Sequence, residues 1–77
     1  MTVKEMVMNA ANRGEYGGFA NTDGDWCATR NASEFKSFLQ KHGFTVTKCR
    51  ETAHSTAIAE TEEGFSIAWN GYCRKIQ

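Results

Sequence analysis

The stretch NASEFKSFLQKHGF, residues 31–44, contains the start, the buried face and the end of a predicted helix. Asn31 can cap the first backbone N–H groups, and Glu34 three residues later can complete a capping box. Gly43 stands where a left-handed residue ends a helix, and Phe44 supplies the apolar contact that follows it. Between these ends, side chains that recur with helical spacing form one stripe, made of Phe35, Phe38, Leu39 and His42.

A second helix is expected near the N-terminus. Thr2 and Glu5 repeat the capping-box spacing, and this helix should end near Arg13 with Gly14 as its left-handed terminal residue. Its apolar stripe is made of Val3, Met6, Val7 and Ala10.

Residues 15–30, EYGGFANTDGDWCATR, combine turn residues with large aromatic side chains. The Asp-Gly pair at 23–24 favours a hairpin turn, so one interpretation places short strands near Gly18–Asn21 and Trp26–Thr29. The alternative interpretation is a single ordered loop that its aromatic side chains pin to the core.

The second half of the chain predicts an antiparallel meander. Alternation of apolar and polar residues favours a strand at 44–50, and further strands are expected at 55–60 and 65–69. The sequence therefore predicts an α+β fold, with two helices packed on a small antiparallel sheet of three or four strands. An extra short hairpin near 18–29 belongs to the first interpretation of that segment.

Asn70-Gly71 is the strongest hairpin signal in the chain. A two-residue loop there would pair six side chains on one face of the hairpin: Trp69 with Tyr72, Ile67 with Arg74, and Phe65 with Ile76. Because five of these six are apolar, we expect this face to belong to the core.

Length and composition indicate one small domain, residues 1–77. Nine basic residues balance nine acidic ones, so the formal net charge of zero supplies no long-range attraction for nucleic acid. The N-terminus has no apolar leader segment, and three cysteines form no closely spaced pair, which is typical of a cytoplasmic protein with free thiols. Cys27 and Cys73 each adjoin an aromatic residue and are expected to be buried. We expect no membrane association.

No pattern in the sequence predicts a catalytic centre, a cofactor site or a metal site. Structural zinc sites draw on closely spaced cysteine or histidine pairs, which this sequence lacks. Asn21, Asp23 and Asp25 alternate as in a calcium loop, but Trp26 stands where such a loop needs glycine. A turn that uses Asp and Gly for its backbone geometry explains the same residues.

Two groups of residues predict a surface for a partner protein. Tyr16 and Phe19 are aromatic residues that the core does not require, and aromatic anchors carry much of the binding energy of interfaces. Glu60, Glu62 and Glu63 form an acidic cluster at a predicted turn and could face a basic partner. The alternative interpretations are a loop pinned by its own aromatic residues and a solvated turn.

A second hypothesis involves nucleic acid. Four cations could form a phosphate-binding patch if their strands are neighbours: Lys48, Arg50, Arg74 and Lys75. His54 lies in a polar connection between two predicted strands, where a histidine is either a solvated loop residue or a catalytic one.

Residues 35–54, FKSFLQKHGFTVTKCRETAH, resemble the core of the HicA-type mRNA interferase toxins. That family has a helix ending in Lys-His-Gly-Phe or a similar sequence, then a strand, then a catalytic histidine. The resemblance implies a fold similar to the double-stranded-RNA-binding domain, with His54 as a general acid or base on RNA. Thr52-Ala53 replaces the family's Gly-Ser before this histidine, and the chain has an additional N-terminal helix and aromatic loop.

The first functional hypothesis is a noncatalytic protein-binding module. Small intracellular proteins of this kind include phage and mobile-element inhibitors of host machinery, anti-CRISPR proteins among them, and we expect steric occlusion of a host protein's site. The alternative is RNA binding or mRNA-interferase-like cleavage with His54. A homo-oligomer is a third hypothesis, because an exposed edge strand near Lys48 would allow two copies to pair.

Overall fold

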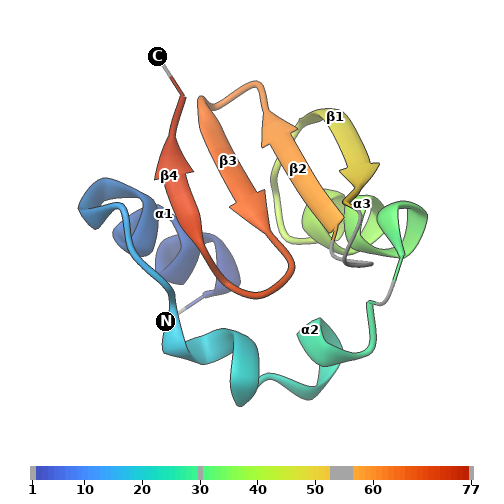
Figure 1. The fold of residues 1–77 in the computed structure, drawn as a ribbon, viewed down its shortest axis with the longest axis horizontal. Helices are drawn as coiled ribbons and strands as arrows, with labels where there is room; N and C mark the ends of the chain where they lie inside the picture. Colours follow the sequence, from blue (N-terminus) through green and yellow to red (C-terminus); the bar gives the residue numbers. More distant parts are fainter. Residues whose placement is uncertain (1, 30, 53–56, 77) are drawn as a thin grey trace.

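A four-stranded antiparallel sheet carries two longer helices on one face (Figure 1). The computed structural model describes residues 2–29, 31–52 and 57–76. The helices are α1 (Val3–Arg13) and α3 (Ala32–Lys41), with the short helices η1 (Gly18–Asn21) and α2 (Gly24–Cys27) between them. The strands follow in the spatial order β1 (Val46–Glu51), β2 (Ala57–Thr61), β3 (Phe65–Ala68) and β4 (Cys73–Lys75). The predicted α+β class and the C-terminal meander are confirmed.

Both longer helices start at their predicted caps. The Thr2 hydroxyl accepts from the Glu5 backbone N–H at 3.1 Å, and the Glu5 carboxylate accepts from the Thr2 backbone N–H. At α3, Asn31 accepts from the Glu34 backbone N–H at 2.8 Å. The Glu34 carboxylate accepts from the Asn31 side-chain amide instead of its backbone. Gly14, with a φ of 64°, ends α1 as predicted.

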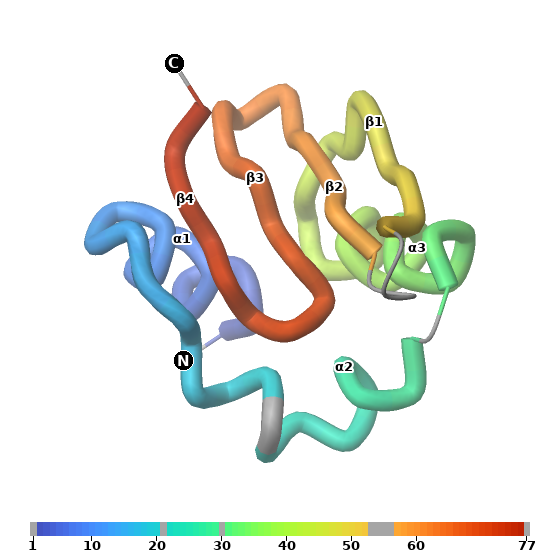
Figure 2. The backbone as a smooth tube through the Cα atoms, viewed as in Figure 1, coloured from blue at the N-terminus to red at the C-terminus, as the bar shows by residue number. Residues whose placement is uncertain are grey.

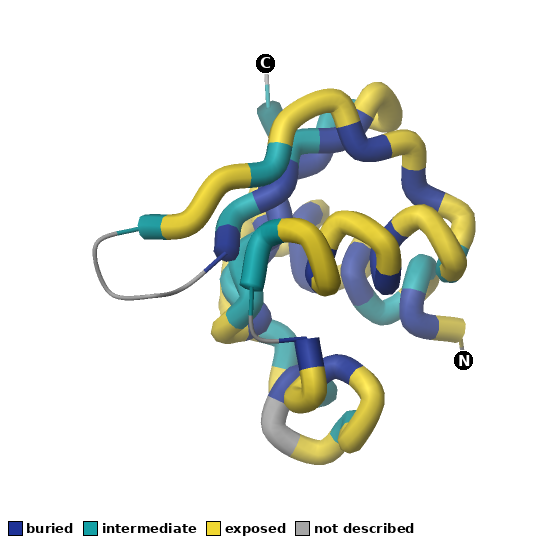
Figure 3. Tube along the Cα trace, turned by 90° about the vertical axis from the view of Figure 1, so that its right-hand side faces the viewer, coloured by how far each residue is buried: buried dark blue, intermediate teal, exposed yellow. Residues whose placement is uncertain are grey.

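The two helices divide the covered face of the sheet between them. α1 packs against β3 and β4, and α3 packs against β1 and β2. Buried and exposed positions alternate along α3 (Figure 3), where Phe35, Phe38 and Leu39 are buried. This burial of the helix stripes against one side of the sheet supplies the core.

Residues 18–21 and 24–27 form short helices in the segment where one of the two interpretations placed strands. The strands predicted near Gly18–Asn21 and Trp26–Thr29 are wrong, because η1 and α2 occupy this segment. The Asp23 side chain accepts from the Trp26 backbone N–H at 2.9 Å, so the Asp-Gly pair starts a helical turn instead of a hairpin turn. Trp26 is fully buried, and its ring packs edge-on against Phe19, Phe35 and Phe38.

The predicted register of the last hairpin is wrong by one residue. The structure pairs Phe65 with Lys75, Ser66 with Arg74, and Ile67 with Cys73. Gly71 adopts a φ of 95° and donates to the Ala68 carbonyl, while the Ala68 N–H donates to the Tyr72 carbonyl, which makes a three-residue loop. The shift of one residue exchanges the two faces of β4. Cys73 is therefore in the core, and Tyr72 and Arg74 lie on the opposite face.

The cysteines are free thiols, but their burial differs from the prediction. Cys73 is fully buried, as expected. Cys27 is exposed, because Trp26 beside it occupies the side of α2 that faces the core.

Candidate functional site

The face of the sheet opposite α1 and α3 is uncovered, since none of the elements in the described part of the chain packs on it (Figure 1). We call this surface the open face. Eight side chains alternate onto it in two rows that cross the strands. The register gives one row of Arg50, Ile58, Ala68 and Tyr72 and a second of Lys48, Glu60, Ser66 and Arg74.

A shallow trough of about 170 Å³ lies in the open face over β3. Ser66 and Ala68 on β3 form its floor, because their side chains are small. The larger side chains of the neighbouring strands form its walls: Arg50, Ile58, Glu60, Tyr72 and Arg74.

Tyr16 extends the open face beyond β4. Its side chain is 64% exposed and packs edge-on against Tyr72, with 4.8 Å between ring centroids. Two backbone hydrogen bonds hold this segment beside β4: Gly17 N–H donates to the Gly71 carbonyl, and Cys73 N–H donates to the Glu15 carbonyl. Figure 2 shows the segment running along β4 after α1. The sheet therefore presents a pair of tyrosines at this side.

Many acidic side chains form hydrogen bonds within the fold, whereas the cations of the open face form no ion pair with a described residue. Five carboxylates accept hydrogen bonds at helix starts and loops, those of Glu5, Asp23, Glu34, Glu51 and Glu63. By contrast, the side chains of Lys48, Arg50 and Arg74 form no ion pair within the part of the chain that the structure describes. A chain with zero net charge thus has an open face on which these three cations accompany one carboxylate, that of Glu60.

Comparison with known proteins gives no relative from which a function could be transferred. No family model, curated protein or solved structure matches this chain. The interpretation of the open face therefore depends on its own residues.

The described residues contain neither a membrane-spanning helix nor a cluster of metal-binding side chains. None of their helices has the length and apolar character needed to cross a membrane. Within the same residues, no three His, Cys, Asp or Glu side chains lie close enough to hold a metal ion together.

The predicted acidic cluster is divided by the structure. Glu60 lies on the open face, whereas Glu62 and Glu63 are exposed in the turn after β2. The Glu63 carboxylate accepts from the Thr45 backbone N–H at 3.0 Å. Desolvation alone would raise the pKa of Glu63, but the hydrogen bonds from Thr45 and from the Glu63 backbone, together with the positive charge of Lys4, outweigh it and lower that pKa below its usual value. Glu63 thus has a structural contact of its own.

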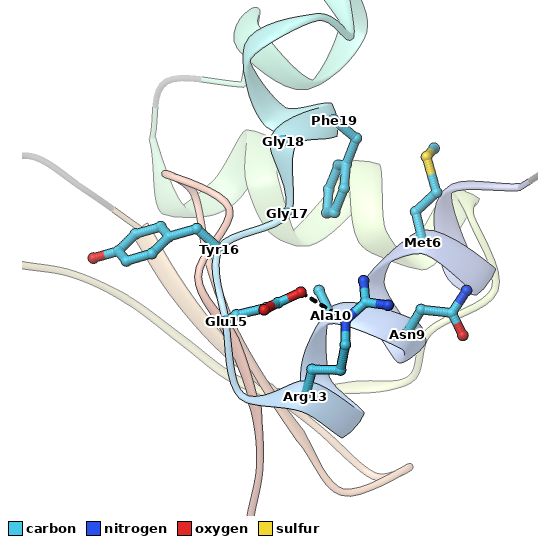
Figure 4. Close-up of a pocket in the computed structure, with 9 residues that line it drawn as sticks. All are labelled: Met6, Asn9, Ala10, Arg13, Glu15, Tyr16, Gly17, Gly18 and Phe19. Atoms are coloured by element: carbon cyan, nitrogen blue, oxygen red, sulfur yellow. Dashed lines mark ion pairs between the residues drawn. The ribbon is translucent and has the colours of Figure 1, made fainter.

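The two aromatic residues predicted to bind a partner face different surfaces. Phe19 is half-buried in a separate groove of about 380 Å³ between α1 and residues 15–19 (Figure 4). The Arg13–Glu15 ion pair, at 2.6 Å, lies at one end of this groove. In Figure 4 the ring of Tyr16 points away from Phe19 and Met6.

Three of the four predicted cations come together. Lys48, Arg50 and Arg74 share the open face, but Lys75 pairs with Phe65 on the other face of the sheet. His54, the residue of the alternative hypothesis, lies outside the described residues.

Sequence reasoning missed Tyr72 as a surface residue. The incorrect hairpin register had assigned it to the core, opposite Trp69. One available signal was Gly71 as the last residue of a three-residue loop, a second hairpin type that Asn70-Gly71 also permits. That loop places Cys73 inward and Tyr72 outward.

Proposed function

We propose that this chain is a noncatalytic module that binds a partner protein through the open face of its sheet. The observation that supports this most is the presence of two tyrosines and two arginines around a floor of small side chains: Tyr16, Tyr72, Arg50 and Arg74. Tyrosine and arginine commonly anchor protein interfaces, because each combines a large contact area with hydrogen-bonding groups.

A steric mechanism requires only that the bound domain covers part of its partner. The chain exposes 4713 Å² in total, and an interface of standard size, about 800 Å² on each partner, would occupy roughly a sixth of this surface. A domain bound in this way blocks the partner surface beneath it. Membership of the phage or mobile-element inhibitors of host machinery, anti-CRISPR proteins among them, stays a prediction.

RNA binding is the second candidate, because Lys48, Arg50 and Arg74 share the open face. Glu60 reduces the net positive charge of that face, and the zero net charge of the chain adds no long-range attraction for nucleic acid. We therefore favour a protein partner.

Affinity capture from host lysate, with and without nuclease, tests the proposed function. The full chain serves as bait beside two variants, Tyr16→Ala on the open face and Met8→Ala on α1, since both side chains are large, apolar and exposed. We expect a stoichiometric protein that survives nuclease, is retained by Met8→Ala and binds Tyr16→Ala about tenfold more weakly or worse. RNA that nuclease removes, or a protein that both variants retain equally, would contradict the proposal.

A further inference from the structure

The trough on the open face has two cationic walls. Arg50 lies on β1 and Arg74 on β4, which are the two outer strands of the sheet. Both side chains are exposed, and neither forms an ion pair with a described residue. Their guanidinium groups are therefore available to an incoming anionic group, which they can bind through paired hydrogen bonds.

Glu60 does not cancel this positive charge. It lies directly opposite Lys48 in the β1–β2 pairing. Directly opposed residues in an antiparallel pair have Cβ atoms about 4.5–5.5 Å apart, so the charge of Lys48 offsets that of Glu60. The charges of Arg50 and Arg74 remain for the ligand.

The lining of the trough is mixed in polarity. Ala68 and Ile58 provide apolar contacts, and the Ser66 hydroxyl provides a polar one. This hydroxyl makes no hydrogen bond with another described residue. Ser66 is 8% exposed and lines the trough. It can therefore hydrogen-bond to a ligand that lies along β3.

Along the strand direction, the spacing of the two arginines matches that of an extended polypeptide. Arg50 and Arg74 belong to neighbouring rows, which lie two residues apart along the strands, about 6.6–6.8 Å. Across the sheet the two residues are three strand spacings apart, roughly 14 Å, and both side chains line the trough between them. An extended peptide repeats its side chains on one face with the same spacing. A nucleic acid has a phosphate at every nucleotide, whereas a peptide can carry negative charge only at the positions that face the two arginines.

We propose that the trough holds an extended acidic segment of the partner protein, in which two carboxylates two residues apart bind Arg50 and Arg74. The Ser66 hydroxyl contributes a hydrogen bond to the segment between them. This inference rests on the proposed function, because it names the chemistry of the partner at the same face.

Titration of the isotope-labelled full chain with three probes, followed by NMR, tests this inference. The probes are a short peptide with a central Asp-x-Asp, the matched Asn-x-Asn peptide and a short oligouridine. We expect only the Asp peptide to shift the backbone amide signals of Ser66, Ala68 and Arg74. Arg74→Glu should weaken its binding by about tenfold or more. Lys75→Glu, the same charge change on the other face of β4, should leave binding close to that of the unchanged chain.

The possible failures are distinguishable. Equal shifts with both peptides, no shift with either, or unchanged binding in Arg74→Glu would overturn the acidic-segment inference. The proposed function would still stand if Tyr16→Ala weakened capture of the partner protein. Tighter binding of oligouridine at the same amides would overturn both, because the ligand of the open face would then be nucleic acid. Circular dichroism of Arg74→Glu confirms that the variant is folded.

Discussion

The indole N–H groups of Trp26 and Trp69 each donate a hydrogen bond to the backbone carbonyl of the other residue. Trp26 belongs to α2 and is fully buried, whereas Trp69 follows β3 and is half-buried. This exchange ties α2 to the hairpin that carries Tyr72 and Arg74. The two hydrogen bonds between Trp26 and Trp69 therefore help to hold the hairpin whose opposite face carries Tyr72 and Arg74.

The two tryptophans should contribute very differently to stability. Trp69→Phe should lower the free energy of unfolding by only about 1 kcal/mol, since the Trp26 carbonyl also accepts from Thr29. Trp26→Ala should lower it by about 3–5 kcal/mol, because it removes a fully buried ring that packs against three others. Equilibrium unfolding in urea measures both. Equal losses would contradict the central position of Trp26.

Gly71 should tolerate no side chain. Its φ is +95°, and a Cβ there would lie 2.7 Å from the Ala20 Cβ and 2.9 Å from the Gly17 carbonyl oxygen. Gly71→Ala should therefore cost at least about 2 kcal/mol of stability. Gly14→Ala is the matched control, because its φ is +64° but no atom lies within 4 Å of the added Cβ. It should cost only about 1 kcal/mol. Thermal unfolding of both variants would show a similar loss if the Gly71 contacts were unimportant.

Cys73 should make the protein less stable in alkali. Burial raises the pKa of its thiol from 9.0 to about 12. Between these pH values the unfolded chain ionises the thiol, whereas the folded chain keeps it neutral. The contribution of Cys73 to the free energy of unfolding is therefore complete below pH 9 and declines as the pH rises from 9 toward 12. Cys73→Ala should remove this part of the decline, whereas alanine at the exposed Cys27 should not. Urea unfolding at a series of pH values measures it, and identical alkaline slopes for the two variants would refute the prediction.

The chain should be monomeric in dilute solution. β1 is an edge strand, but its ladder to β2 has an irregularity between Val46 and Lys48. Antiparallel pairing of two β1 strands about Cys49 would place Lys48 opposite Arg50 of the second copy, and directly opposed like charges are destabilising. Light scattering over a range of concentrations checks this. Dimerisation of the unchanged chain would contradict it, whereas the double variant Lys48→Thr, Arg50→Thr should associate more readily.

The sequence was sufficient to predict the helices whose ends depend on local contacts. The caps at Thr2 and Asn31 and the apolar stripes require only spacing along the chain. α2 was not predictable in this way, because Asp23-Gly24 suits either a hairpin turn or a helix start. Burial of Trp26 among distant aromatic rings favours the helix.

Whether Tyr72 and Arg74 belong to the candidate site depends on a shift of one residue in the register of the β3–β4 hairpin. Asn70-Gly71 suits both a two-residue and a three-residue hairpin loop, and only the second brings Tyr72 and Arg74 to the open face. Lys48 and Arg50 were predicted to belong to a phosphate-binding patch. That they share a face with Arg74 could be known only from the order of the strands in the sheet. The sequence therefore supplied the residue types, and the packing of the whole sheet determined which of them lie together.

Two neighbouring residues of β4 give the most direct test of the open face. Arg74 lies on this face and Lys75 on the other, and both are exposed cations. Calorimetry with the captured partner protein should compare Arg74→Glu and Lys75→Glu. If the open face is the binding surface, Arg74→Glu weakens binding by about tenfold or more while Lys75→Glu leaves it nearly unchanged. Equal effects, or a larger loss in Lys75→Glu, would show that the partner binds elsewhere.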